Sequence, residues 1–128
     1  MLKIMLKGLV MLTFLGSAAA AFAGVRPLDQ ALFDRTMAQG KPAIVYFHAD
    51  WCPTCRAQQP IVDRLAAAPE MKDVTVFVAD YDKEVALKKA LRVTHQSTFV
   101  VFKGGHEVTR STGQTDEQHI RVTWEKAL

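Results

Sequence analysis

Cysteine is scarce in this chain, because Cys52 and Cys55 are the only two among its 128 residues. Two cysteines cannot form the set of several disulfides that holds a small secreted scaffold together. They also cannot supply all four ligands of a structural zinc site made of cysteines. Covalent haem attachment needs a histidine directly after a C-x-x-C motif, and here Arg56 follows. The pair must therefore be explained as one C-x-x-C unit in the stretch ADWCPTCRAQQP, residues 49–60.

Charge of one sign does not dominate the chain either, since it has 16 basic and 13 acidic residues. Lys3 and Lys7 precede sixteen uncharged residues, Gly8 to Ala23, that end in an A-x-A cleavage motif typical of an export signal. A membrane anchor is the alternative, but a bilayer span needs roughly 20 apolar residues. We expect a signal peptide over residues 1–23 and a periplasmic domain over residues 24–128. With 14 basic and 13 acidic residues, that domain offers no basic surface to nucleic acid.

After the leader, helical and strand patterns alternate along the chain. Helical spacing of apolar residues predicts four helices, over residues 28–42, 53–68, 83–93 and 115–128. Thr115 is the expected N-cap of the last helix, and Pro60 is expected to kink the second. Short apolar, β-branched runs predict four strands, over residues 43–49, 74–82, 97–103 and 106–112. The order predicts a single α/β domain: a central mixed sheet flanked by helices, with an antiparallel hairpin at one edge.

The two cysteines lie where the first predicted strand is followed by a helix. If Cys52 begins that helix, its sulfur faces unpaired backbone N–H groups and the positive end of the helix dipole, which both stabilise a thiolate. Cys55 lies about one turn later, so it can attack a disulfide formed at Cys52. A purely structural bridge is a poor explanation, because closing a loop of four residues contributes only about 2 kcal/mol. Binding of copper or zinc stays open, with His48 as the candidate third ligand.

Together these features resemble the thioredoxin family from about Leu28 to the C-terminus. The stretch AIVYFHADWCPTC is similar to the family's strand leading into W-C-x-x-C, and STFVVFKGGHEV is similar to its terminal hairpin. The resemblance implies a thioredoxin fold, with the C-x-x-C motif at the N-terminus of a helix kinked at its proline. It also implies thiol–disulfide exchange without a bound cofactor, with Cys52 as the nucleophile and Cys55 as the resolving thiol. The implied active-site environment comprises Trp51, Pro53, Thr54, Tyr46 and Asp50.

Two departures from the family pattern concern proton transfer. The family's buried aspartate under the cysteines is matched here by Tyr46, and its lysine neighbour by Val78. The group that takes the proton of Cys55 is therefore open among the Tyr46 hydroxyl, Asp50, His48 and water.

A third departure is Ser97, which stands at the position of the family's cis-proline. A cis bond before a residue other than proline costs roughly 2.5 to 4 kcal/mol, so we predict a trans Gln96–Ser97 peptide. We expect the Ser97 hydroxyl to donate a hydrogen bond towards a cysteine sulfur. Gln96 and Thr98 are expected to contact the backbone of an extended substrate segment.

The predicted function is that of a periplasmic, monomeric thiol:disulfide oxidoreductase that reduces disulfides in exported proteins. A membrane thiol reductase is the expected electron donor. The compact chain lacks the helical insertion of the related disulfide-introducing oxidases, which favours reduction by analogy. An oxidase and a copper or zinc carrier that uses the two thiolates remain the alternatives.

Overall fold

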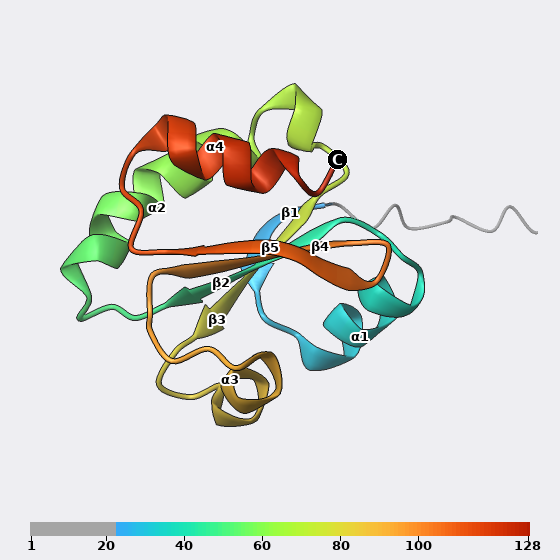
Figure 1. Ribbon diagram of the computed structural model, residues 1–128, viewed down its shortest axis with the longest axis horizontal. Helices are drawn as coiled ribbons and strands as arrows, with labels where there is room; N and C mark the ends of the chain where they lie inside the picture. The colour runs from blue at the N-terminus through green and yellow to red at the C-terminus, as the bar shows by residue number, and fades with distance from the viewer. Residues whose placement is uncertain (1–22) are drawn as a thin grey trace, which may run out of the picture.

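The computed structural model describes residues 23–128, in which one five-stranded sheet lies between two pairs of helices (Figure 1). The predicted export signal and its membrane-anchor alternative fall almost entirely on residues 1–22, outside the described residues. Within residues 23–128, no helix is long and apolar enough to cross a membrane.

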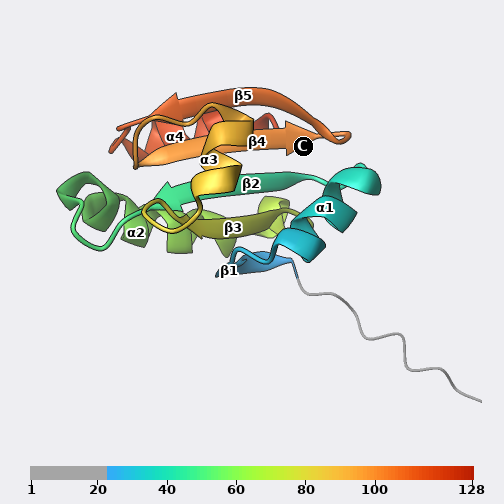
Figure 2. The same ribbon diagram turned by 90° about the horizontal axis from the view of Figure 1, so that it is seen from below.

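The elements alternate largely as predicted. Their order is β1 (Gly24–Pro27), α1 (Gln30–Ala38), β2 (Ala43–His48), α2 (Pro53–Ala66), a 3-10 turn (Pro69–Met71), β3 (Thr75–Asp80), α3 (Val85–Leu91), β4 (Thr98–Lys103), β5 (His106–Thr112) and α4 (Glu117–Glu125). The strands lie in the order β1-β3-β2-β4-β5 (Figure 2). Strands β1, β3 and β2 pair in parallel, whereas β4 pairs antiparallel with both β2 and β5. The predicted mixed sheet with an edge hairpin is confirmed.

Strand β1 is absent from the predicted order. It pairs in parallel with β3, from Gly24 beside Thr75 to Pro27 beside Val78. Its sequence is GVRP, and three of its four residues are exposed, so the sequence shows no alternation of hydrophobic and polar residues that would predict a strand. It forms because the edge of β3 offers unpaired backbone groups, and such a tertiary effect leaves no local signal in the sequence.

Two hydrophobic cores lie on opposite faces of the sheet, because successive side chains of a strand point to opposite faces. Ile44 and Tyr46 of β2 pack with α2 and α4 on one face. Val45 and Phe47 pack with α1 and α3 on the other. All four of these side chains are fully buried, as expected for a central strand covered on both faces. This packed strand fixes the position of the loop after His48, which leads to the cysteines.

The N-terminus of α4 lies one residue later than predicted. Asp116, not Thr115, is the N-cap, and its Oδ1 accepts a hydrogen bond from the His119 N–H at 3.0 Å. Both residue types are good caps, so the sequence pattern alone could not choose between two adjacent candidates.

Replacing Asp116 by alanine should lower the free energy of unfolding by about 1 kcal/mol, because the His119 N–H loses its acceptor. The matched control is Thr115→Ala, which should change that free energy by less than about 0.5 kcal/mol. Urea denaturation of both variants measures the difference. Equal losses in the two variants would contradict the assignment of Asp116 as the cap.

Candidate active site

Cys52 is the N-cap of α2, at the position that the sequence predicts. Its backbone is extended, with φ −85° and ψ 114°, and its Sγ accepts a hydrogen bond from the Cys55 N–H at 3.1 Å. The sulfur thus takes the place that a serine or aspartate oxygen holds in an ordinary cap. Pro53 is the first helical residue, where its missing N–H leaves no hydrogen bond unmade.

Both cysteines are buried and have free thiols. Cys52 is 1% exposed and Cys55 is 0% exposed, and neither is in a disulfide. They form a small apolar cluster with Ala49, against which Tyr81 packs. A substrate sulfur can therefore reach Cys52 only if neighbouring side chains move.

Ser97 connects the two sulfurs. Its Oγ lies 3.1 Å from Cys52 Sγ and 3.2 Å from Cys55 Sγ, so the predicted contact with a cysteine is present and extends to both. The residue is 4% exposed and has a φ of 59°, in the left-handed region that residues other than glycine rarely adopt. The described residues contain no cis peptide bond, so the Gln96–Ser97 peptide is trans, as predicted.

The backbone of Ser97 explains why proline is unsuited to this position. The Ser97 N–H donates to the Phe47 carbonyl oxygen at 2.8 Å, and the Ser97 carbonyl accepts from the Gly113 N–H at 3.0 Å. Proline has no N–H to donate and holds φ near −65°, on the opposite side of zero from the observed value. These bonds place Ser97 between the end of β2 and the residue after β5.

The pKa values of the two thiols move in opposite directions. Burial acts to raise the pKa of Cys52, but hydrogen bonds from the Cys55 thiol, Ser97, the Cys55 N–H and Gln96 outweigh it, so this pKa is lowered. Burial raises the pKa of Cys55, and its interaction with Cys52 raises it further. Of the two thiols, Cys52 is therefore the one that loses its proton first, and Cys55 keeps its proton to a higher pH.

Tyr46, which stands at the position of the family's buried aspartate, does not take over proton transfer from Cys55. Its hydroxyl donates to the Cys55 carbonyl oxygen at 3.2 Å, and the side chain is fully buried. Burial raises the pKa of the Tyr46 hydroxyl far above its usual value, so this side chain does not act as a base near neutral pH. Val78, at the position of the family's lysine, is the β3 partner of Tyr46 in the sheet. The side chain that contacts both thiols directly is Ser97.

His48 and Asp50 face each other rather than the thiols. Their Nδ1 and Oδ1 atoms are 3.7 Å apart, and the Asp50 side chain is fully exposed. No group of three histidine, cysteine or acidic side chains converges anywhere in residues 23–128. His48 therefore does not complete a three-ligand metal site with Cys52 and Cys55 in this arrangement.

Trp51 stands on the surface next to Cys52. It is 57% exposed, and its Nε1 donates to Asp82 Oδ2 at 2.7 Å, which holds the ring against the loop after β3. Both residues line a cavity of about 470 Å³ together with His48, Asp50 and Asp80. Asp82 was not among the predicted site residues, although its place after the carboxyl end of a parallel strand is where such sites form.

Gln96 and Thr98, the two residues expected to contact substrate, lie in different environments. Gln96 is half-buried, and it is one of the groups whose hydrogen bonds lower the pKa of Cys52. Thr98 is 2% exposed, and its hydroxyl donates to the His95 carbonyl at 2.8 Å. Its backbone pairs with β2 on one side and β5 on the other. The backbone of Thr98 therefore already has pairing partners on both sides, and contact of Thr98 with a substrate stays a prediction. Thr54, in the first turn of α2, is half-buried.

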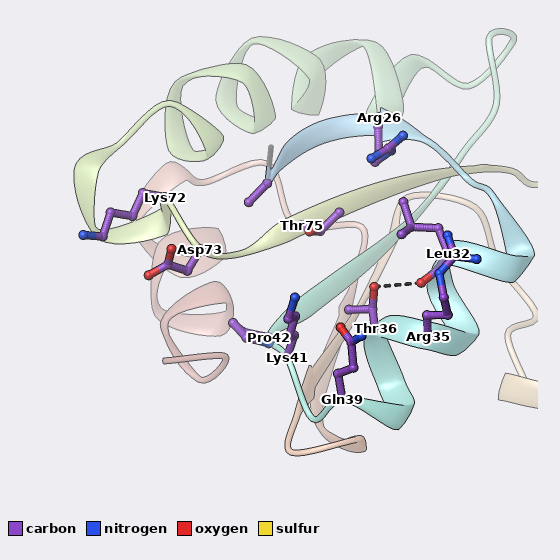
Figure 3. A pocket seen from close by; sticks show the side chains of 11 residues that line it. Arg26, Leu32, Arg35, Thr36, Gln39, Lys41, Pro42, Lys72, Asp73 and Thr75 are labelled. Atoms are coloured by element: carbon purple, nitrogen blue, oxygen red, sulfur yellow. Dashed lines mark hydrogen bonds between the residues drawn. The ribbon is translucent and has the colours of Figure 1, made fainter. Parts of the chain in front are cut away.

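Figure 3 shows the lining of a second cavity, which has a volume of about 490 Å³. Residues of β1 and α1 line it together with Pro42 and Thr75, which stand at the amino ends of β2 and β3. Because the cysteines follow the carboxyl end of β2, this cavity is at the opposite end of the sheet and takes no part in the thiol site.

Replacing Ser97 by alanine should raise the pKa of Cys52 and make the reduction potential more negative, because the reduced form loses a hydrogen bond that stabilises its thiolate. Ser97→Gly removes the same hydroxyl but tolerates positive φ, so its two shifts should match while its melting temperature stays at or above that of the alanine variant. Thiolate absorbance and equilibration with glutathione measure the two quantities. If both stayed unchanged in the alanine variant, the hydroxyl would have no role at the thiols.

Comparisons with known proteins agree with this geometry. The family model for thioredoxin matches residues 24–126. A thioredoxin of Chlamydia pneumoniae is 32% identical over 96 residues, which are 75% of this chain and 91% of that protein. A bifunctional thioredoxin reductase/thioredoxin of Mycobacterium leprae is 27% identical over 79% of this chain and 22% of its own. The crystal structure of Trxlp from Edwardsiella tarda has 36% identity and a TM-score of 0.74, with 77% of this chain and 95% of that chain covered. The chain therefore belongs to the thioredoxin family, and it is a thioredoxin-like thiol–disulfide oxidoreductase.

Proposed function

We propose that this protein is a periplasmic reductase of disulfides in exported proteins, with Cys52 as the nucleophile and Cys55 as the resolving thiol. The observation that carries the proposal is the position of Cys52 Sγ at the N-cap of α2, 3.1 Å from both the Cys55 nitrogen and Ser97 Oγ, with Cys55 fully buried behind it. These contacts lower the pKa of Cys52, and burial raises the pKa of Cys55. Only a thiolate attacks a disulfide, and the resolving thiol has to stay protonated until the mixed disulfide has formed.

In the first step, the Cys52 thiolate attacks one sulfur of the substrate disulfide. A bond forms between Cys52 Sγ and that sulfur, the substrate S–S bond breaks, and the other substrate sulfur leaves as a thiolate that takes a proton from solvent. Before the attack, the Ser97 hydroxyl and the Cys55 N–H hold the negative charge on Cys52.

In the second step, Cys55 loses its proton and attacks Cys52 Sγ. The Cys52–Cys55 disulfide forms, the bond between Cys52 Sγ and the substrate sulfur breaks, and that sulfur leaves as a thiol, so two electrons have passed from the dithiol to the substrate. The Ser97 Oγ, 3.2 Å from Cys55 Sγ, is placed to accept the Cys55 proton while its own proton passes towards the departing sulfur. Ser97 thereby takes the part that the sequence left open among Tyr46, Asp50, His48 and water.

Access to Cys52 requires a local rearrangement, because this residue is only 1% exposed. Gln96 is the half-buried residue before Ser97, and its side chain is one of the groups that lower the pKa of Cys52. Its backbone is not part of the pairing of β4 with β2 or β5, because both of these ladders begin at Thr98. An extended substrate segment that pairs with Gln96 would displace the Gln96 side chain and expose the sulfur.

Two features bear on the direction of electron flow. A thioredoxin domain joined to a thioredoxin reductase, as the name of the Mycobacterium leprae relative describes, supports reduction. The Ser97 hydrogen bonds favour the reduced dithiol, which by itself makes the pair a stronger oxidant. The disulfide-introducing oxidase is therefore the second candidate, and the reduction potential distinguishes the two.

The proposed periplasmic location and the proposed electron donor are based on the N-terminal sequence. The basic and apolar pattern of residues 1–23 supports export with cleavage before Gly24, and a membrane thiol reductase would then supply electrons. N-terminal sequencing of the exported protein should begin at Gly24. A chain that keeps Met1 after expression in a Gram-negative host would contradict the cleavage.

Disulfide exchange with insulin tests the activity. The reduced protein should reduce insulin, Cys52→Ser should be inactive, and Cys55→Ser should accumulate a mixed disulfide visible on a non-reducing gel, because only the first step remains. A reduction potential below about −200 mV would support the reductase, and one near −120 mV would establish the oxidase instead. Activity retained in Cys52→Ser would contradict the assigned nucleophile.

A further inference from the structure

Gln58 is a fully buried polar residue one helical turn after Cys55 in α2. Its Nε2 donates to the Gln114 carbonyl oxygen at 2.8 Å and to the Ser97 carbonyl oxygen at 3.4 Å. Ser97 immediately precedes β4, and Gln114 follows β5. The side chain therefore joins the helix that contains both cysteines to the two segments that flank the terminal hairpin.

The orientation of the Gln58 amide is determined by its partners. Both partners are carbonyl oxygens, which only accept hydrogen bonds, so the amide nitrogen has to point at them. The amide oxygen then faces away, and Gln58 Oε1 is a buried acceptor without a hydrogen-bond partner within residues 23–128. An unpaired buried acceptor is destabilising, and an apolar side chain at this position would avoid it. The donor side of the amide is therefore the part that this buried position uses.

The conformation of Ser97 needs such support. A left-handed φ is strained for serine and persists only where the surroundings impose it. Three hydrogen bonds act on the backbone of Ser97: its N–H donates to Phe47, and its carbonyl accepts from Gly113 and from Gln58. The bond from Gln58 is the one among these that a side chain supplies, and so the one that substitution can remove.

We propose that Gln58 is a positioning residue that holds Ser97 in its left-handed conformation and thereby keeps the Ser97 hydroxyl between the two cysteine sulfurs. Within the described residues Gln58 forms no hydrogen bond with either sulfur, so it acts on them through Ser97. The inference rests on the proposed role of Cys52 as the thiolate nucleophile. It adds a residue outside the C-x-x-C motif to the groups that set the reactivity of the pair.

The test is a double-mutant cycle between positions 58 and 97, read out as the pKa of Cys52. Gln58→Met removes the amide N–H groups that donate to Ser97 and Gln114, at nearly constant side-chain volume. It should raise the pKa of Cys52 and slow alkylation of Cys52 at neutral pH several-fold. In the Ser97→Ala background the same substitution should have no further effect, because the hydroxyl that it positions is already gone. Gln59→Met is the matched control, since Gln59 bonds only to Asp63 on the outer side of α2. It should leave the pKa unchanged.

Each outcome decides the inference. If Gln58→Met changes the melting temperature but not the pKa of Cys52, Gln58 has only a structural role and the inference is wrong. The inference would also be wrong if Gln58→Met shifted the pKa of Cys52 equally in the wild-type protein and in the Ser97→Ala variant. Should Gln58→Met not fold, Gln58→Asn keeps the amide but shortens its reach, and it has to raise the same pKa. The titration needs no disulfide substrate, so a failure to reduce insulin would reject the proposed function without affecting this result.

Discussion

The hydroxyl of Ser97, 3.1 Å from one cysteine sulfur and 3.2 Å from the other, is the contact on which this active site depends. It helps to offset the burial of Cys52, which would otherwise hold that thiol in its neutral form. Its oxygen also lies within hydrogen-bonding distance of the Cys55 sulfur, and within residues 23–128 no carboxylate forms a hydrogen bond with either sulfur. In the proposed mechanism this single neutral side chain serves both steps of the exchange, which are formation of the thiolate and deprotonation of the resolving thiol.

The fold places this hydroxyl through a chain of packed elements. Strand β2 is buried on both faces, and its Phe47 carbonyl receives the Ser97 N–H. Helix α2 begins at the end of the loop after β2 and contributes both cysteines and Gln58. The hairpin of β4 and β5 returns the chain so that Gly113 donates to the Ser97 carbonyl. Because each element is held by the packed sheet, the strained backbone of Ser97 is maintained at the one place where its side chain can reach both sulfurs.

Much of this arrangement could be predicted from the sequence. The C-x-x-C spacing after an apolar run placed Cys52 at the start of a helix, and the strength of the steric penalty for a cis bond predicted the trans peptide at Ser97. Other features depend on contacts between distant residues. Strand β1 exists because β3 offers an edge, Thr98 is enclosed by two neighbouring strands, and Gln58 is buried because two loops meet above α2. No local sequence pattern distinguishes β1 from a loop, Thr98 from a substrate-binding residue, or Gln58 from a solvated glutamine.

Hydrogen bonding gives the two thiols of this site, which are chemically identical side chains, different pKa values. The most direct measurement is a pH titration of the reduced wild-type protein by NMR, with the Cβ carbons of Cys52 and Cys55 observed individually. Cys52 should titrate at a lower pH than an unperturbed thiol, and Cys55 at a higher pH. Two thiols that titrate together at the unperturbed value, or a Cys55 that ionises first, would show that the hydrogen bonds at this site do not separate them.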